Sequence, residues 1–246
     1  MDKRTYDIVS TTAGWLTRHE GEFLEKAVRE LVPKTGAIVE IGSYCGKSTM
    51  WLAQGRETVY AIDPHKGDVS GGKTRPTLPE FLENLRRAGL AEYVKPIVHT
   101  SKKAAEEWKK PVKFLFIDGL HDEAHALEDF SLWNPFVVEG GIVAMHDAFC
   151  GWDGAGNVAM RHIVYSEEYK EVGVVGSIIF GIKGKASVIN RIQKIYNQII
   201  IELCSSIYKS NFISKRVQFI LVHRFLRIFL LNRFSSLSPA GKNSVR

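Results

Sequence analysis

Acidic residues follow several apolar runs of this 246-residue sequence, at points where strands are expected to end. Glu40 lies within the first apolar run. Asp63, Asp118 and Asp147 lie at the ends of three later runs. Carboxylates abstract protons, accept hydrogen bonds from hydroxyl groups and ligate hard cations such as Mg²⁺. Because random strand ends would rarely carry so many acids, the pattern indicates one ligand site that draws on several strands.

Two glycines follow the first acid, in the stretch AIVEIGSYCGKST of residues 37–49. Gly42 and Gly46 predict a sharp turn from strand to helix, with a backbone that can approach a ligand closely. Ser43, Tyr44 and Cys45 separate the glycines, so the middle glycine that a dinucleotide pyrophosphate needs is missing. A phosphate loop needs one more residue between its glycines, which also disfavours a nucleotide triphosphatase. A tight turn without a ligand is the simpler alternative.

Asp63 follows the next expected strand, 21 residues after Gly42. A carboxylate at this place of a nucleotide-binding sheet accepts hydrogen bonds from the ribose hydroxyls. The spacing therefore predicts a nucleoside ligand. The alternative is that Asp63 caps a helix that begins at Pro64, and the two roles do not exclude each other.

Strand-like and helix-like patterns alternate along residues 1–186, and this alternation predicts a parallel sheet with helices on both faces. The last two strands, 171–176 and 178–184, are close together and are expected to pair antiparallel. The other expected strands are 37–42, 58–63, 94–100, 112–119 and 140–149, and the expected helices are 21–31, 48–55, 78–90, 101–110 and 123–133. The fold class is α/β, a doubly wound, mostly parallel seven-stranded sheet with a C-terminal helical extension.

A sheet of this kind binds its ligand beyond the carboxyl ends of the strands, where the strand order switches. The residues to examine for chemistry are therefore those that follow the strands. They are the glycine turn, Asp63, Thr100 and Ser101, residues 118–122, and His146 with Asp147.

The pattern E-x-G-x-Y-x-G-x-S-T of residues 40–49 resembles motif I of class I S-adenosylmethionine-dependent methyltransferases. It is closest to the O-methyltransferase branches, which carry a bulky residue in place of the middle glycine. The run FLFIDGLHDEAHALEDFSLWNPFVVEGGIVAMHD, residues 114–147, is similar to the family of sugar O-methyltransferases and cephalosporin hydroxylases. The resemblance covers roughly residues 35–185 and implies a Rossmann-like methyltransferase fold with S-adenosylmethionine as cofactor.

The resemblance also implies how the cofactor is held. Glu40 and the Gly42 backbone are expected at its methionine end, Asp63 at its ribose, and residues 99–101 near its adenine. The full set of expected cofactor-binding residues is Glu40, Gly42, Ser43, Gly46, Asp63, Thr100, Ser101 and Asp118.

Transfer of a methyl group to a hydroxyl requires a base for the proton and residues that align the acceptor. The resemblance assigns these tasks to Asp118, His121, His146 and Asp147. His121 is expected to be the general base or to orient Asp118, since histidine titrates near neutrality. Asp118 and Asp147 are expected to ligate Mg²⁺, which would lower the pKa of a coordinated hydroxyl. Leu120 and His146 stand where relatives often have further acids.

Purely structural roles are the alternatives for the residues of this group. Asp118 with Gly119 is also typical of a simple turn, and Asp147 of a helix cap. His121 and His125 are four residues apart and would share a helix face, but HDEAH lacks the order of the zinc motif H-E-x-x-H. We therefore expect His125 at the surface or in the core rather than at a metal.

Two loops are candidates for contact with the acceptor. Residues 64–78 are long, glycine-rich and basic, and they predict either a lid over the substrate or a surface loop. Trp152 and Asp153 resemble the loop that follows the fifth strand in the family, which often contacts the acceptor.

The charge of the chain divides it into two parts. Residues 1–186, the expected methyltransferase domain, hold 23 Lys and Arg against 26 Asp and Glu, whereas residues 187–246 hold 10 against one. Residues 217–234 are apolar but interrupted by basic residues, so they are too charged for a confident membrane span. We expect residues 187–246 to be a basic amphipathic helical extension, with residues 187–234 on an anionic membrane surface, or packed on the domain or a second subunit.

These observations predict an S-adenosylmethionine-dependent methyltransferase that methylates a hydroxyl of a sugar, glycan or small molecule. An NAD(P)-dependent oxidoreductase and a non-catalytic, membrane-associated binding domain are the alternatives. No nucleic-acid partner is expected because no recognisable motif accompanies the basic segment. The three cysteines have no metal spacing, and no apolar leader precedes the domain, so we expect a reducing, cytoplasmic location, peripheral to the inner face of the membrane.

Overall fold

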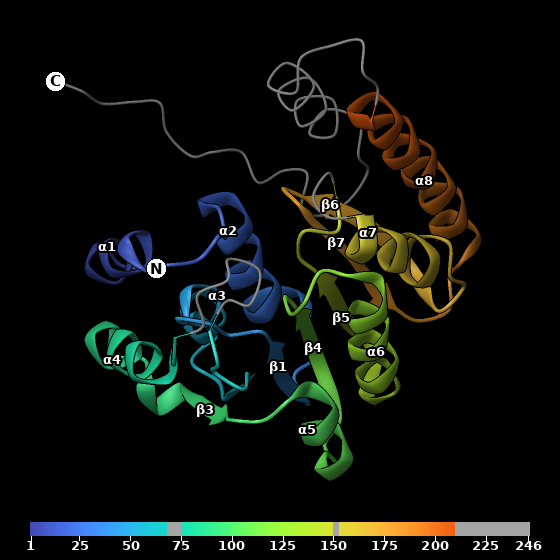
Figure 1. The fold of residues 1–246 in the computed structure, drawn as a ribbon. Coiled ribbons are helices and arrows are strands. Elements are labelled where there is room, and N and C mark those ends of the chain that lie inside the picture. The colour runs from blue at the N-terminus through green and yellow to red at the C-terminus, as the bar shows by residue number, and fades with distance from the viewer. Residues whose placement is uncertain (68–74, 150–152, 210–246) are drawn as a thin grey trace, which may run out of the picture.

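The computed structural model describes residues 1–67, 75–149 and 153–209. A seven-stranded sheet with the order β3-β2-β1-β4-β5-β7-β6 lies at its centre (Figure 1). Strands β1 to β5 pair in parallel, and β7 is antiparallel to both of its neighbours. The strands are β1 Ala37–Ile41, β2 Val59–Ile62, β3 Val94–Ile97, β4 Val112–Ile117, β5 Val137–Met145, β6 Tyr169–Val175 and β7 Ile178–Lys183.

All seven predicted strands are present, and the antiparallel pairing of the last two is confirmed. Strands β4 and β5 are neighbours, so the carboxyl ends that carry Asp118 and Asp147 lie side by side. The order switches at β1, which pairs with β2 on one side and β4 on the other. A nucleotide is expected to bind at this switch point, beyond the carboxyl ends of the strands.

Helices cover both faces of the sheet (Figure 1). One apolar cluster joins the sheet to α1–α4 and the other joins it to α5–α8. The helices are α1 Lys3–Thr11, α2 Arg18–Lys26, α3 Lys47–Leu52, α4 Leu78–Ala88, α5 Ser101–Glu107, α6 Glu123–Trp133, α7 Asp153–Ala159 and α8 Val188–Lys209.

Alternating side chains along the strands supply both clusters. In β4, Phe114 and Phe116 join the cluster beneath α2–α4, whereas Leu115 and Ile117 join the cluster beneath α5–α8. Each of these side chains is at most 3% exposed. Burial of a large apolar side chain contributes about 1.5–3 kcal/mol, so a strand buried on both faces is firmly held.

Polar residues before several helices fix where these helices begin. Thr17 and Glu20 form a reciprocal capping box at the start of α2. Thr100 accepts a hydrogen bond from the Lys103 backbone at α5, and Asp122 accepts one from the His125 backbone at α6. These caps satisfy backbone N–H groups that have no partner within the helix.

Helix α7 was not predicted from the sequence, because two glycines lower its helix propensity. The structure shows why glycine is needed there. A Cβ on Gly154 would lie 2.4 Å from the backbone nitrogen of Glu123, and one on Gly156 would lie 2.9 Å from the carbonyl oxygen of Ala148. Close packing against α6 and the end of β5 therefore overrides the local preference. The predicted helix 21–31 also begins earlier, at Arg18, and its last turn is π-helical.

The C-terminal extension begins as a helix, α8, which packs on β6 through Ile200, Ile201 and Cys204. The expected amphipathic stretch 217–234 lies outside the described residues, as do residues 68–74 of the proposed lid and Trp152. Within the described ranges, no helix combines the length and hydropathy that a membrane span requires.

Candidate active site

The glycine turn after β1 is left-handed at three positions, with φ of +88° at Gly42, +45° at Tyr44 and +90° at Gly46. A Cβ on Gly42 would lie 2.0 Å from the carbonyl oxygen of Asp118, at the end of β4. Gly42 is therefore required by the contact between two strand ends, whether or not a ligand also approaches it. The turn is closed by a 2.7 Å hydrogen bond from the Gly46 amide to the Ser43 carbonyl.

Glu40 is fully buried beneath this turn. Its two carboxylate oxygens accept hydrogen bonds from the hydroxyls of Ser48 and Thr49, both at 2.5 Å. Burial raises the pKa of Glu40 to about 8, against the opposing effect of the two hydroxyl donors. Glu40 therefore fastens the first turn of α3 to β1. Its contact with a cofactor remains a prediction.

Asp63 connects the glycine turn with the end of β2. Its Oδ2 accepts a 2.8 Å hydrogen bond from the Tyr44 amide, and its Oδ1 accepts a 2.6 Å bond from the His65 amide. No described helix begins at Pro64, so the alternative of a helix cap is wrong. The carboxylate instead lies beside the glycine turn, and its contact with a ribose stays a prediction.

Two buried polar atoms near the turn have no hydrogen-bond partner among the described residues. One is the hydroxyl oxygen of Ser43, within the turn. The other is Nε2 of His65, whose Nδ1 lies 2.9 Å from the Thr77 hydroxyl. Buried polar atoms normally have partners, so unpaired ones beside a glycine turn fit a polar cofactor that would complete them.

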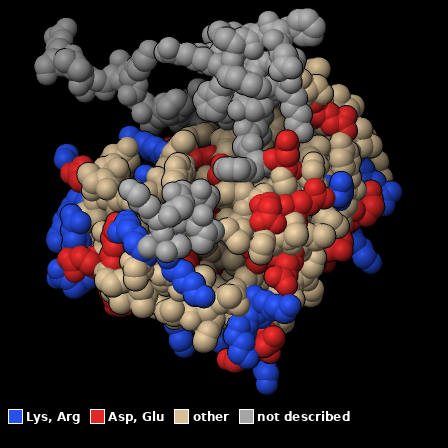
Figure 2. Space-filling model, viewed as in Figure 1, with Lys and Arg blue, Asp and Glu red and all other residues tan. Residues whose placement is uncertain are grey.

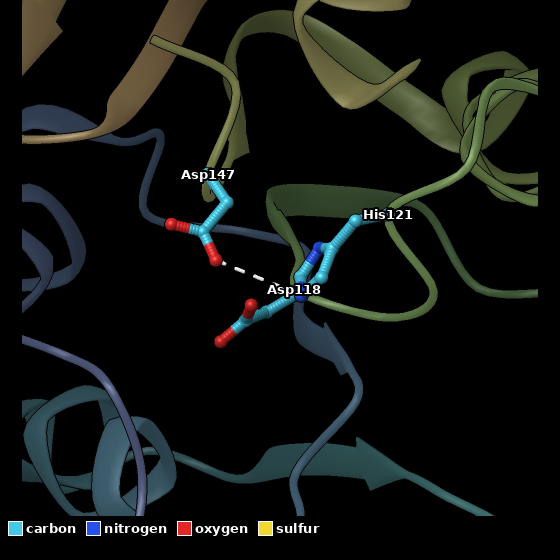
Figure 3. A group of neighbouring side chains, drawn as sticks. All are labelled: Asp118, His121 and Asp147. Carbon is cyan, nitrogen blue, oxygen red and sulfur yellow. Dashed lines mark ion pairs between the residues drawn. The ribbon is translucent and has the colours of Figure 1, made fainter. Parts of the chain in front are cut away.

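Asp118, His121 and Asp147 converge at the carboxyl ends of β4 and β5 (Figure 3). One ligand atom from each lies within 4.8 Å of the others, and all three residues are half-buried. The Nε2 atom of His121 lies 3.6 Å from Oδ2 of Asp147. Two carboxylates and one imidazole at these distances suit a divalent cation or a proton-accepting site.

His146 lies buried behind this group and contacts three carboxylates. Its Nδ1 is 3.1 Å from Oδ1 of Asp118 and 3.5 Å from Oδ2 of Asp147, and its Nε2 is 3.7 Å from Oε2 of Glu20. Burial by itself lowers the pKa of His146, but Asp118, Asp147 and Glu20 together raise it well above its ordinary value. The imidazolium in turn lowers the pKa of Asp147 against the effect of burial. The three carboxylates therefore favour the protonated form of His146.

Asp147 has a left-handed backbone, with φ of +50°. Aspartate tolerates this conformation better than most residues, and such strain is common at functional sites. No described helix begins at Asp147, so the alternative that Asp147 caps a helix is wrong.

Glu20 was missed by the sequence analysis, although it reaches the site from α2. Oε1 accepts hydrogen bonds from the backbone and hydroxyl of Ser177, at 2.6 and 2.9 Å, and Oε2 accepts two from Thr17. Burial alone would raise the pKa of Glu20, but His146 and these donors lower it to about 2. The T-x-x-E pattern of a capping box was the available signal, and it identifies a helix start rather than a site.

The residues expected near adenine have structural partners. Thr100 caps α5, and the Ser101 hydroxyl accepts a 2.9 Å hydrogen bond from the Trp133 indole. Asp129 lies near Ser101, and burial raises the pKa of Asp129 to about 6. Oδ2 of Asp129 would lie only 2.8 Å from a Cβ on Gly119, which places this carboxyl group just beneath the end of β4. The contacts of Thr100 and Ser101 with adenine stay predictions.

The N-terminal segment covers the outer side of the glycine turn. Lys47 donates a 2.9 Å hydrogen bond to the carbonyl of Gly14, and the Trp15 and Tyr44 rings are 5.8 Å apart. Trp15 is nevertheless 72% exposed. His125 is exposed and pairs with Asp122 at the surface, which is one of the two places expected for it.

Comparisons with known proteins agree with this architecture. A family model described as a methyltransferase domain matches residues 39–148. The O-methyltransferase of Bacillus cereus, in complex with S-adenosylhomocysteine, has a TM-score of 0.55 and 19% identity over 74% of this chain and 92% of that one.

Two further solved structures share the fold. TomG, an O-methyltransferase of tomaymycin synthesis from Streptomyces achromogenes in complex with S-adenosylmethionine, has a TM-score of 0.54 and 16% identity over 75% and 91% of the two chains. CalS11, a TDP-rhamnose 3'-O-methyltransferase of calicheamicin biosynthesis, has a TM-score of 0.51 and 15% identity over 74% and 93%. At these identities the structural likeness establishes the fold.

Proposed function

We propose that the chain is a class I S-adenosylmethionine-dependent methyltransferase whose acceptor atom is a hydroxyl oxygen of a sugar, glycan or other small molecule. The observation that carries this proposal is the convergence of Asp118, His121 and Asp147 beside the glycine turn. A hydroxyl is a weak acid, so its methylation calls for groups that orient it and accept its proton. The shared fold of a sugar-nucleotide O-methyltransferase supports a sugar acceptor.

In the proposed complex, the glycine turn and the end of β2 hold the cofactor. Gly42, Ser43 and Gly46 would present the backbone and one unpaired hydroxyl to its methionine part, and Asp63 would accept the ribose hydroxyls. Glu40 would act mainly by holding α3 against β1. When bound, S-adenosylmethionine supplies a methyl group that is already activated as part of a sulfonium.

The chain's own residues then align the acceptor and remove its proton. Asp118 and Asp147 would orient the acceptor hydroxyl toward the activated methyl group of the cofactor that the glycine turn would hold. His121 or Asp147, 3.6 Å apart, would take the hydroxyl proton. His146 would compensate the charge of Asp118 and Asp147 and so keep both carboxylates in place.

Mg²⁺ fits the same group. Asp118 and Asp147 would supply hard oxygen ligands, with His121 as the third neighbour. A bound cation would lower the pKa of the acceptor hydroxyl. Because the imidazolium of His146 already offsets these carboxylates, we expect weak, millimolar cation binding, measured by calorimetric titration with MgCl₂ and abolished in Asp147→Asn.

The test of cofactor binding is calorimetric titration with S-adenosylhomocysteine. We expect micromolar binding to the native protein and a loss of at least about 100-fold in Asp63→Ala, which removes the predicted ribose acceptor. Tight NAD binding without S-adenosylhomocysteine binding would instead favour the oxidoreductase alternative.

The test of the reaction uses methyl-labelled S-adenosylmethionine with a panel of sugar nucleotides. We expect Asp147→Asn to lower turnover by about 10²–10⁴-fold, the usual contribution of a positioned acid–base group. Asp7→Asn, at an exposed acid of α1 outside the cluster, is the matched control and should retain native turnover. Equal turnover in native protein and Asp147→Asn would contradict the assignment.

We also propose that the basic C-terminal segment, residues 187–234, brings the enzyme to an anionic membrane surface. The support is the charge asymmetry between the two parts of the chain. Flotation with vesicles of phosphatidylcholine and phosphatidylglycerol tests it, and binding should weaken as salt rises. A protein that stays unbound on such vesicles at low salt would remove the membrane role.

A further inference from the structure

Helix α8 has two unlike faces. One face is buried against β6 and carries Ile200, Ile201, Cys204 and the fully buried Asn197. The opposite face exposes six aliphatic side chains, each 46–77% accessible, and they are Val188, Ile189, Ile192, Ile195, Ile199 and Leu203. We call these six residues the α8 stripe. Along α8, at the upper right of Figure 2, the surface consists mostly of residues other than Lys, Arg, Asp and Glu.

The spacing of the α8 stripe is that of a helix–helix seam. Val188, Ile192, Ile195 and Ile199 follow one another at steps of four, three and four residues. This repeat keeps side chains in line along one face, which is how two packed helices interlock. Single exposed aliphatics are ordinary on a protein surface, but six of them on one helical face mark an interaction site.

We propose that the α8 stripe is the interface of a homodimer, in which α8 packs antiparallel on α8 of a second copy. A two-fold axis brings the same patch of both copies together, so the patch must be complementary to itself. A seam of branched aliphatic side chains meets this requirement. Its exposed surface is several hundred Å² per copy, so with a rim of polar residues it approaches the roughly 800 Å² per partner of a standard interface.

The charges beside the α8 stripe favour the antiparallel arrangement. Arg191 lies near its N-terminal end and Glu202 near its C-terminal end, and by helical geometry both stand on the same flank. In an antiparallel pair, Arg191 of one copy therefore lies opposite Glu202 of the partner subunit. A parallel pair would place like charges at the same height. The Glu202 carboxylate also accepts a hydrogen bond from the Tyr165 hydroxyl, which holds it at this edge.

A lipid surface fits the α8 stripe less well than a second copy does, so the membrane contact proposed for residues 187–234 is expected to use the basic residues outside the stripe. Helices that lie on anionic membranes carry Lys and Arg along the edges of their apolar face. Among the described side chains of α8, Arg191 is the exposed basic residue, since Lys194 is buried and donates to the Ser166 carbonyl. Residues 1–186, which would face the same membrane, have more acids than bases.

The experiment is sedimentation velocity of the full-length protein from 1 to 50 µM. We expect a dimer for the native chain and a monomer for Ile195→Glu, whose residue lies at the middle of the stripe, with a dimer Kd raised by at least about 100-fold. Leu82→Glu makes a comparable change at a single exposed aliphatic of α4, 46% accessible and outside the α8 stripe, and should stay dimeric. Unchanged S-adenosylhomocysteine affinity and circular dichroism would show that Ile195→Glu is folded.

Charge reversal tests the direction of the two helices. Arg191→Glu and Glu202→Arg should each weaken the dimer, and the double variant should restore it. A monomeric native protein, or an Ile195→Glu variant that remains a dimer, would overturn the proposal. A monomeric native protein that floats with phosphatidylglycerol vesicles and loses this in Ile195→Glu would assign the stripe to lipid instead.

Discussion

At the scale of single residues, Glu40 shows how a motif acid serves the fold before it serves a ligand. It is buried, and the hydroxyls of Ser48 and Thr49 hold it beneath the glycine turn. Its pKa of about 8 in the folded protein exceeds the ordinary value of 4.5. The folded state therefore binds the proton more tightly than the unfolded state does. The resulting stabilisation is complete below about pH 4.5 and is lost as the pH rises through about 8.

Glu40→Gln removes this titration and keeps the size of the side chain. Native protein should lose on the order of a few kcal/mol of unfolding free energy between pH 5 and 8.5 that the variant does not lose. Urea unfolding at both pH values measures this difference. Glu92→Gln, at an exposed acid, should follow the native protein. Parallel pH dependences of native protein and Glu40→Gln would show that the buried carboxyl is not held protonated.

A second residue-scale prediction concerns Glu20, whose buried carboxylate joins α2, the β6–β7 turn and His146. Its pKa of about 2 lies below the ordinary value, so its stabilisation is present above about pH 4.5 and lost as the pH falls toward 2. Glu20→Gln should lower the unfolding free energy at pH 7 by about 3 kcal/mol, because it leaves a buried imidazolium short of one carboxylate. Glu22→Gln, in the same helix, should change it by less than about 0.5 kcal/mol. Equal values for the two variants in urea unfolding would refute the role of Glu20.

At the scale of elements, the glycine turn is limited by how closely the ends of β1 and β4 approach. Gly42 and Gly89 both have left-handed backbones, with φ of +88° and +66°. The two positions differ in the room for a side chain. A Cβ on Gly42 would lie 2.0 Å from the carbonyl oxygen of Asp118, whereas a Cβ on Gly89 would have no atom within 4 Å. A comparison of substitutions at Gly42 and Gly89 therefore separates the energetic cost of backbone strain from that of a steric clash.

Gly89→Ala should therefore cost about 1 kcal/mol, the strain of a left-handed alanine. Gly42→Ala should cost more than about 3 kcal/mol and also weaken S-adenosylhomocysteine binding, because it forces the two strand ends apart. Urea unfolding and calorimetric titration of both variants measure these effects. Similar costs for the two substitutions would mean that the strand ends separate easily.

Elements with a strong repeating pattern were predictable from the sequence, and elements held by distant contacts were not. The seven strands follow from apolar runs between helices, and the convergence of Asp118 with Asp147 follows from the parallel order. Helix α7 depends on glycines that fit against α6 and β5, and a helix-propensity argument counts them against it. Glu20 reaches His146 across 126 positions of sequence, and no local pattern encodes such a distance.

At the scale of the whole molecule, the residues of the candidate site lie in the acidic part of the chain, residues 1–186, whereas residues 187–246 are strongly basic. The strand order switches at β1, which lies between β2 and β4. The glycine turn, Asp63 and the carboxylate–histidine cluster lie together at the carboxyl ends of these strands. Acidic residues also gather over α6 and α7 on the face seen in Figure 2, whereas the bases of residues 187–246 lie far along the chain. Cofactor binding should therefore depend on the sheet edge and be insensitive to α8.

This division predicts how a ligand changes the stability of the folded chain. S-adenosylhomocysteine at 100 times its Kd should raise the unfolding free energy by about 2.7 kcal/mol, since it binds the folded state alone. For a chain of this size the midpoint of thermal unfolding should rise by about 5–10 °C. Asp63→Ala should show no rise at the same concentration, because the turn loses its link to β2 as well as the ribose acceptor. Ile195→Glu, on the outer face of α8, should show the full native rise. A rise in Asp63→Ala equal to that of native protein would place the ligand away from the glycine turn.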